Sequence, residues 1–172
     1  MSRYFPHPPY AEDQPLARTI LTTHVETRSI TTGTVVGAAI FATQEALRRF
    51  RKTAPSTTPL LPRSQHYLRV AGKSTLWTVG IVSVGLVGRM WGREEIEWKD
   101  RSWRLMENEG QLETDDWTYG GMAAGLMATA LLKRPISWVA IVGSVGTGSL
   151  VGVLGYLGWK NVIHRRSSQT QG

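Results

Sequence analysis

The sequence predicts an all-α membrane protein in which four short, glycine-rich transmembrane helices pack as a bundle. Two observations carry this prediction: glycines recur four residues apart inside apolar runs, and tryptophans flank the same runs. An internal glycine costs a soluble helix about 1 kcal/mol relative to alanine, whereas in a bilayer small residues let two helix backbones approach closely. We therefore expect eight helix-packing glycines: Gly33, Gly37, Gly88, Gly92, Gly121, Gly125, Gly148 and Gly152.

Four apolar segments define the expected spans. They cover about residues 30–47, 75–91, 117–132 and 136–159, within a transmembrane domain of residues 30–160. The last span is the strongest, since Trp138 and Trp159 are 21 residues apart, which is about 31 Å of helix and close to the thickness of a bilayer core. The other three are barely long enough, which leaves four buried helices of a soluble protein as the alternative.

Tryptophans mark the ends of these spans. Indole rings are enriched at both membrane–water interfaces, because the ring is apolar and its N–H is polar. Five of the seven tryptophans occupy such positions. We expect them to be interface anchors: Trp77, Trp91, Trp117, Trp138 and Trp159.

Residues 1–29 form an N-terminal arm in this interpretation. Residues 1–15 contain four of the eight prolines, which predicts an extended, helix-free segment. Apolar residues between Leu16 and Val25 then recur on one helical face, which indicates either a short interfacial helix or a solvated lead-in. At the other end of the chain, residues 161–172 are expected to form a polar tail.

The connection between the second and third spans predicts a water-exposed amphipathic helix that ends near Gly110. Acidic and basic residues follow one another at the favourable i,i+4 spacing, in the pairs Glu95/Lys99, Glu97/Arg101 and Asp100/Arg104. A plain solvated helix would not need two tryptophans, so this helix either covers the bundle or docks on a partner, and we favour docking. The candidate docking residues are Trp98, Trp103 and Met106.

Charge is distributed unequally among the connections, although the chain as a whole has a formal charge of +7. Seven Lys and Arg residues and no acid lie between Arg48 and Lys73, whereas residues 93–116 contain four basic and nine acidic residues. The positive-inside rule places the basic 48–74 loop, together with Lys133 and Arg134, in the matrix or cytosol and both termini in the opposite compartment. Because the basic residues do not cover one face, nucleic acid is not an expected partner.

No pattern in the sequence predicts a catalytic, cofactor-binding or metal site. The chain has no cysteine, which excludes disulfides, thiol catalysis and iron–sulfur ligation. Residues 70–75 end like a phosphate-binding loop, but Tyr67 stands where that motif needs glycine. The four histidines are isolated in sequence and are expected at the surface: His7, His24, His66 and His164.

Three charged residues near the spans have simple structural interpretations. Asp115 and Asp116 precede the third span, where we expect them to cap the helix rather than to serve as a general acid and base. Glu45 is spaced to pair with Arg48 or Arg49 at the end of the first span. We expect no cofactor, and bound phospholipid is the one ligand compatible with this interpretation.

The overall pattern resembles the mitochondrial protein-import translocase superfamily, which includes an accessory subunit of respiratory complex I (NADH:ubiquinone oxidoreductase). The clearest local match is residues 115–125, Asp-Asp-Trp-Thr-Tyr-Gly-Gly-Met-Ala-Ala-Gly. Family members have an acidic pair, often an aromatic and a polar residue, and then Gly-x-x-x-Gly at the start of the third span. The chain departs from the motif because Gln111 replaces its arginine and only three residues separate Asp116 from Gly120.

The resemblance implies a non-catalytic accessory subunit of complex I in the mitochondrial inner membrane. Such a subunit would stabilise or help to assemble the membrane arm by helix packing, and its partners would be other membrane subunits and the lipid bilayer. It would have no active site of its own. Three alternatives stay open: a subunit of an inner-membrane protein translocase, an assembly factor, and a membrane enzyme. The enzyme would need several acidic or histidine side chains close together at one depth in the membrane.

Overall fold

The computed structural model describes residues 4–50, 62–131 and 136–169, with the side chains of the last helix through Val162. Every regular element within these residues is a helix, which confirms the predicted all-α class. In chain order they are the short 3-10 helix η2 (Ala11–Asp13), α1 (Ala17–Phe50), α2 (Arg63–Met90), α3 (Glu95–Glu107), α4 (Glu109–Ala130) and α5 (Trp138–Gln169).

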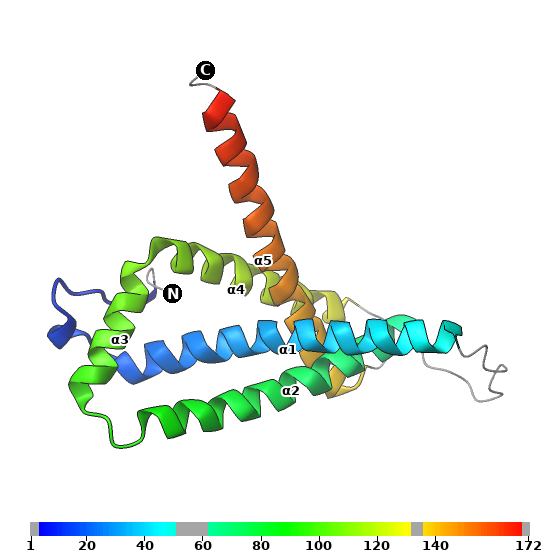
Figure 1. Ribbon diagram of the computed structural model, residues 1–172, viewed down its shortest axis with the longest axis horizontal. Coiled ribbons are helices and arrows are strands. Elements are labelled where there is room, and N and C mark those ends of the chain that lie inside the picture. Colours follow the sequence, from blue (N-terminus) through cyan, green and yellow to red (C-terminus); the bar gives the residue numbers. More distant parts are fainter. Residues whose placement is uncertain (1–3, 51–61, 132–135, 170–172) are drawn as a thin grey trace.

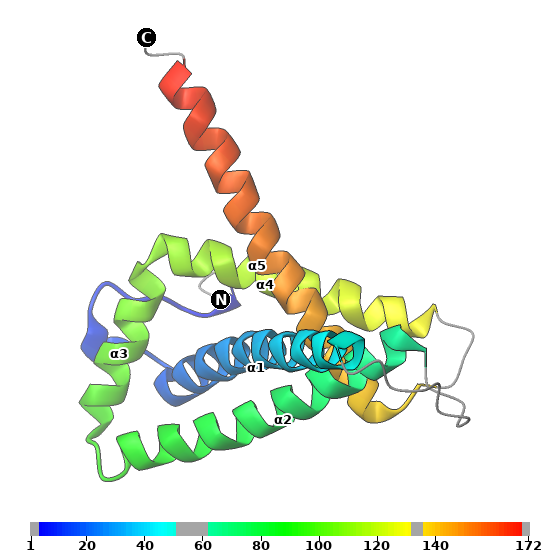
Figure 2. The same cartoon turned by 45° about the vertical axis from the view of Figure 1, so that its right-hand side comes forward.

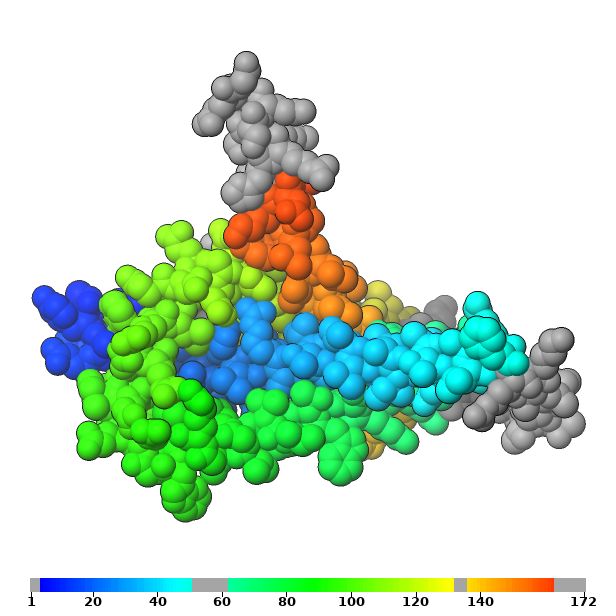
Figure 3. Space-filling model, viewed as in Figure 1, coloured from blue at the N-terminus to red at the C-terminus, as the bar shows by residue number. Residues whose placement is uncertain are grey.

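Helix α5 crosses the other helices and separates them into two groups. α1 and α2 lie side by side in opposite directions, and α3 covers the end where α1 begins and α2 finishes (Figure 1). α5 packs against α4 on one side and against α2 and α1 on the other (Figure 2). The ribbon of its C-terminal half extends away from the other helices (Figure 1), and the space-filling view shows the coloured part of α5 rising above them (Figure 3).

Two of the described helices are long and apolar enough to cross a membrane. α2 contains a stretch of mean hydropathy 1.4, and residues Trp138–Val162 of α5 contain one of 1.6. α1 and α4, which include the expected first and third spans, are less apolar or more charged over the same length. Apolar helices of spanning length are thus found at the second and fourth of the four expected spans.

The first helix is longer than predicted. A short interfacial helix and a separate span from residue 30 were expected, but α1 is one continuous helix of 34 residues, or about 51 Å. No proline interrupts the segment between its two expected parts, and extending a formed helix is easier than starting a new one. The arm joins this helix at Leu16, whose φ of 54° is a strained, left-handed conformation for a leucine.

Three other helices also extend beyond the spans expected from the apolar pattern. α2 begins at Arg63, so the second half of the predicted basic loop is helical, whereas residues 51–61 of that loop lie outside the described residues. α4 begins at Glu109 rather than at Trp117, and α5 continues to Gln169 through the expected polar tail. Polar residues extend each helix beyond its apolar part, and an apolar pattern does not detect them. The predicted Lys133–Arg134 turn also lies outside the described residues.

Local capping interactions determine where α2, α3 and α4 end and begin. Glu94 and Glu97 form a reciprocal capping box at the start of α3. The side chain of Asn108 accepts a hydrogen bond of 3.2 Å from the backbone N–H of Gln111 at the start of α4. α2 ends just before Gly92, whose φ of +68° favours glycine. Gly92, which was expected to pack against another helix, therefore ends α2 instead.

The backbones of α4 and α5 touch where the two helices cross. A Cβ atom added to Gly121 would overlap the backbone carbonyl of Gly148, and one added to Gly148 would overlap the carbonyl of Gly121. Two further contacts of this kind join the same helices, between Gly125 and Ser144 and between Gly152 and Trp117. Any larger residue at these glycines would separate α4 from α5.

The opposite face of α5 touches α2 in the same way. A Cβ atom on Gly143 would overlap the carbonyl of Leu68, and one on Gly72 would overlap the carbonyl of Val139. Gly72 and Gly143 were not among the predicted packing residues, because neither belongs to a Gly-x-x-x-Gly step. At 100° per residue, Gly143 and Gly148 lie on nearly opposite sides of α5, so α5 is held closely on both faces.

Glycines also bring α1 close to α2. A Cβ atom on Gly33 would lie 2.6 Å from the Cα of Thr75, and one on Gly37 would lie 2.6 Å from the Cα of Ala71. At Gly88, by contrast, an added Cβ has no neighbour within 4 Å among the described residues. Of the eight predicted glycines, Gly88 and Gly92 thus make no close helix contact within the described chain.

Adjacent glycines in α4 provide a test of the close crossing. We expect Gly121→Ala to destabilise the protein by about 1–3 kcal/mol, the usual cost of overpacking, because its methyl group would overlap the backbone of α5. Gly120→Ala places the same group in open space and should stabilise the helix by up to about 1 kcal/mol. Thermal unfolding of both variants in mild detergent, followed by circular dichroism, measures the difference. Equal midpoints would show that the crossing does not limit stability.

Candidate functional site

A buried carboxylate joins α1 to α4. The side chain of Asp115 in α4 is 1% exposed, and two residues from successive turns of α1 face it. Arg28 Nη2 lies 2.7 Å from Asp115 Oδ1, and His24 Nδ1 donates a hydrogen bond of 2.9 Å to Asp115 Oδ2. Both carboxylate oxygens thus have a positively charged or N–H partner, which a buried anion requires. We call Asp115, His24 and Arg28 the Asp115 cluster.

Hydroxyl groups extend the Asp115 cluster along the same contact between α1 and α4. Thr27 of α1 and Tyr119 of α4 share a hydrogen bond of 3.1 Å between their hydroxyl oxygens. The hydroxyl of Thr118, by contrast, is buried and bonds within α4 itself, to the backbone carbonyl of Thr114 at 2.6 Å. The facing sides of α1 and α4 are therefore polar, and the bonds between them fix the relative position of the two helices.

A second carboxylate, Glu26, joins α1 to α2. Ser83 of α2 donates a hydrogen bond of 2.6 Å to Glu26 Oε1, and Ser29 of α1 donates one of 3.0 Å to Glu26 Oε2. Glu26 and Arg28 are only two residues apart in α1, but their side chains contact different helices. α1 thus makes charged contacts with α2 on one side and with α4 on the other.

Hydroxyl pairs continue this polar network toward the other end of α1. Thr34 is fully buried and lies 3.2 Å from the hydroxyl of Thr75 in α2. Thr31 donates to Ser149 of α5 at 3.2 Å. Each pair lies beside one of the close glycine contacts, where the backbones are near enough for short side chains to meet. The interior of this protein is therefore lined with hydroxyl groups.

The distribution of polar and apolar side chains is the reverse of that in a soluble protein. Among the described residues, the largest side chains that are fully buried are mostly polar, namely Gln14, Thr34, Thr75, Thr118, Asp115, Ser102 and Ser149, with Ile20 as the apolar member. Large apolar side chains cover the outside of α2 and α5, including Ile81, Val84, Val151 and Leu154. In a soluble protein, buried polar groups and large exposed apolar surfaces are the unusual observations.

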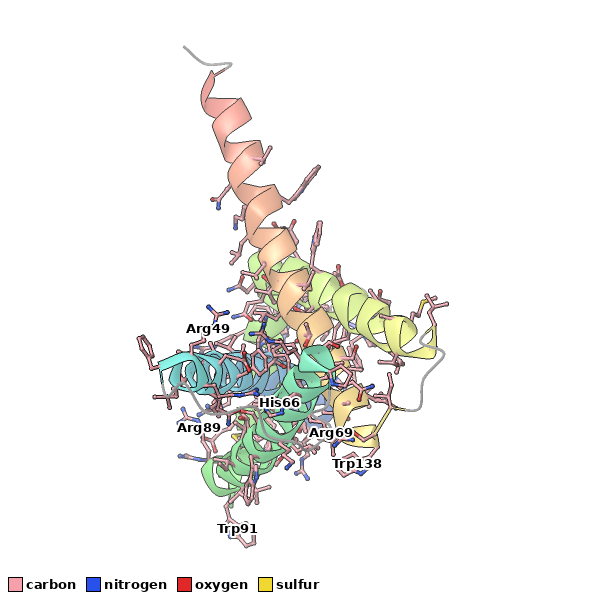
Figure 4. All side chains as sticks on the ribbon, turned by 90° about the vertical axis from the view of Figure 1, so that its right-hand side faces the viewer. Arg49, His66, Arg69, Arg89, Trp91 and Trp138 are labelled. Carbon is pink, nitrogen blue, oxygen red and sulfur yellow. The ribbon has the colours of Figure 1, made fainter. Side chains whose placement is uncertain are left out.

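The predicted interface tryptophans all lie at the surface. Their exposed fractions range from 42% for Trp117 to 80% for Trp91. Figure 4 shows Trp91 at the end of α2 and Trp138 at the start of α5, both projecting away from the helices. Trp91 and Trp138 thus lie at ends of α2 and α5, the two apolar helices, whereas Trp77 lies in the middle of α2 and Trp117 lies within α4.

The predicted docking residues of α3 contact the N-terminal arm of the same chain. Trp103 Nε1 donates a hydrogen bond of 3.0 Å to the carbonyl of Pro8, and its ring centroid is 5.6 Å from that of His7. Arg18 lies over the ring of Trp98, 5.6 Å from its centroid, and Met106 is buried. The arm thus occupies much of the surface that was expected to receive a partner.

The ion pairs of Glu45 and of α3 agree only in part with the predicted pairs. Glu45 pairs with Arg48 at 3.0 Å, as predicted, and also with Arg63. In α3, the Asp100–Arg104 pair is present at 3.0 Å. The other two predicted pairs are wrong, because Glu95 binds Arg18 and Glu97 binds Arg93.

The predictions for His24 and Asp115 are also wrong. His24 was expected at the surface but is 8% exposed. Asp115 was expected to cap a helix, but α4 begins at Glu109, which places Asp115 in the second turn. A signal was present in the sequence, since polar residues recur every three or four positions along one face of α1, at His24, Thr27, Arg28, Thr31 and Thr34.

The described residues form neither a phosphate-binding loop nor a cluster of metal ligands. Residues 70–75 lie inside α2 and form no phosphate-binding loop. No group of three or more His, Cys, Asp or Glu side chains is placed to hold a metal ion in the described ranges. Comparison of the chain with protein-family models, with curated proteins and with solved structures gives no match.

A double-mutant cycle tests whether the Asp115 cluster holds α1 against α4. We expect Asp115→Asn and Arg28→Gln to show a coupling energy of about 2 kcal/mol, because the Asp115 carboxylate is buried and Arg28 is the cation that faces its Oδ1. The exposed Arg93–Glu97 pair should show a coupling below about 1 kcal/mol. Thermal unfolding in detergent measures both cycles, and equal coupling energies would contradict a special role for Asp115.

Proposed function

We propose that this protein is a multi-pass membrane protein whose function is to pack against other membrane subunits. The observation that carries this proposal is the reversed distribution of side chains. Only 17% of the apolar stretch of α2 and 28% of that of α5 are buried within the chain, while hydroxyl and charged groups fill the interior. In lipid, polar groups must find their partners inside the protein and apolar groups can face outward, so a bilayer accounts for both features.

All four long helices cross the membrane in this proposal. α2 and α5 are sufficiently apolar by themselves. α1 packs against α2 through Gly33 and Gly37, and α4 packs against α5 through Gly121 and Gly125, so each more polar helix is covered by an apolar one. Small residues at helix crossings are characteristic of membrane proteins, where close backbone contact is a main source of association.

The orientation follows from a separation of charge between the two ends of the molecule. Every acidic residue except Glu45 belongs to the arm, the first half of α1, the segment around α3 or the first half of α4. The end formed by the last turn of α1 and the first turns of α2 contains Arg48, Arg49, Arg63 and Arg69. By the positive-inside rule, this basic end faces the mitochondrial matrix, and α3 and the arm face the intermembrane space.

Within that class, we infer a non-catalytic accessory subunit of respiratory complex I in the mitochondrial inner membrane. Support comes from the resemblance of residues 115–125, which supply both the buried Asp115 and the crossing glycines Gly121 and Gly125. The polar side chains of the interior pair with one another across helices, as expected for a packing role. Its own chemistry would thus be limited to helix association.

A subunit of a protein translocase is the second candidate. Its supporting observation is the series of carboxylates and hydroxyls on α1, which a translocase could use along a polar path. That function would need polar side chains facing lipid or a water-filled cavity, whereas Glu26, Thr31 and Thr34 form hydrogen bonds to residues of other helices. An assembly factor, the third candidate, would be absent from the mature complex.

Extraction of isolated mitochondria with alkaline carbonate tests the membrane assignment. We expect the protein to stay in the membrane pellet, because α2 and α5 expose apolar surface that only lipid or another membrane helix would cover. A known peripheral protein and a known integral protein of the same membranes serve as controls. Complete release into the supernatant would contradict the proposal and favour a helical soluble protein.

A native gel of mildly solubilised membranes tests the complex I assignment. We expect the chain to migrate with the band that stains for NADH dehydrogenase activity. Gly121→Leu or Gly148→Leu should reduce the amount of protein in that band several-fold, because each side chain would push α4 and α5 apart. Gly120→Leu, which faces open space, is the matched control. Migration in a smaller band without this activity would exclude the complex I assignment.

A further inference from the structure

An open groove lies between α2 and the start of α5, near the basic end of the molecule. It has a volume of about 290 Å³ and is lined by Lys73, Leu76, Trp77, Trp138 and Val139. Both indole rings are mostly exposed, at 75% for Trp77 and 65% for Trp138. The groove thus combines one ammonium group with two aromatic rings and two aliphatic side chains.

The groove is electropositive because its cations have no acidic partners. Lys73 is exposed, and Arg69 precedes it by one turn on the same helix; neither forms an ion pair with a described acidic residue. Figure 4, which looks toward this end, shows Arg69 in the same region as Trp138. Glu45 is the one acid of the basic end, and Arg48 and Arg63 already bind it.

Apolar side chains continue from the groove along α2. Leu76 lines the groove, and Ile81 and Val84 on the following turns are 66% and 73% exposed. An occupant with an anionic group beside Lys73 could therefore lay a hydrocarbon chain along α2 without leaving apolar surface. Inorganic phosphate or a nucleotide would use only the cationic part of this surface.

We propose that this groove binds the phosphodiester headgroup of an anionic phospholipid. Lys73 and Arg69 bind the phosphate, the rings of Trp77 and Trp138 flank the headgroup at the membrane–water interface, and an acyl chain follows Ile81 and Val84. A lipid with net negative charge is favoured over a zwitterionic one, because Lys73 in the groove and Arg69 one turn before it are both cations and the groove contains no acid. This site rests on the proposed membrane location, and it names a ligand that the packing function does not require.

Thermal unfolding of the purified full-length protein in mild detergent tests the site. We expect dioleoylphosphatidylglycerol to raise the unfolding midpoint in a saturable manner, since a ligand that binds the folded state stabilises it. Dioleoylphosphatidylcholine and inorganic phosphate at the same concentrations should have little effect. A similar response to inorganic phosphate would identify a simple anion site and overturn the proposal, as would equal responses to the two lipids.

Charge variants separate this groove from general attraction to a basic surface. We expect Lys73→Gln and Arg69→Gln each to weaken apparent binding of dioleoylphosphatidylglycerol roughly fivefold, the contribution of one basic residue near an anionic surface. Arg89→Gln removes an exposed cation from the other end of α2 and should leave binding unchanged. Equal losses in all three variants, or no loss in the first two, would exclude the groove.

A variant that removes an aromatic ring but no charge tests the groove independently of the charge variants. Trp138→Leu keeps the cations but removes one of the two rings that flank the headgroup, so binding should weaken while the unfolding midpoint without lipid stays the same, since Trp138 is mostly exposed. If these variants bind normally while the protein resists carbonate extraction, only the lipid site is wrong. Release by carbonate would instead remove the membrane location on which the site depends.

Discussion

The close crossing of α5 with its neighbours is the constraint on which the rest of the structure depends. Gly143 brings α5 against the backbone of α2, and Gly148 and Gly152 bring its opposite face against α4. Because one helix touches backbone on both sides, it fixes the distance between the α1–α2 pair and α4. The short side chains of Thr31 and Ser149 can meet across helices only because this distance is small.

Close packing also explains why the interior is polar. Helices that touch through glycine leave little volume for large aliphatic side chains, but they leave room for hydroxyl groups that bond across the contact. Thr34 and Thr75 are examples, since both are buried and their hydroxyls are 3.2 Å apart. The larger apolar side chains then occupy the outer surface, where a bilayer would stabilise them.

Charge adds a direction to this arrangement. The buried Asp115 cluster and Glu26 lie toward the acidic end, where the arm and α3 also pack. Arg69 and Lys73, which form no ion pair with a described acidic residue, lie toward the basic end. Pro8 of the arm accepts a hydrogen bond from Trp103, and Met106 of α3 is buried, so the acidic end is stabilised within the chain itself. The basic end, by contrast, has exposed cations and indole rings, which is consistent with contact to lipid headgroups.

The sequence by itself determined the helical class, the positions of two apolar helices of spanning length and the separation of charge, because these depend on composition and on the spacing of residues along one helix. It also identified Gly121 and Gly148, which lie in regular Gly-x-x-x-Gly steps. The close helix contacts of Gly72 and Gly143 were decided only by the tertiary structure. The same is true of the burial of His24 and Asp115. Which glycine meets a carbonyl, and which charged residue is enclosed, depends on where two helices cross, and the pattern along either helix alone does not contain that crossing point.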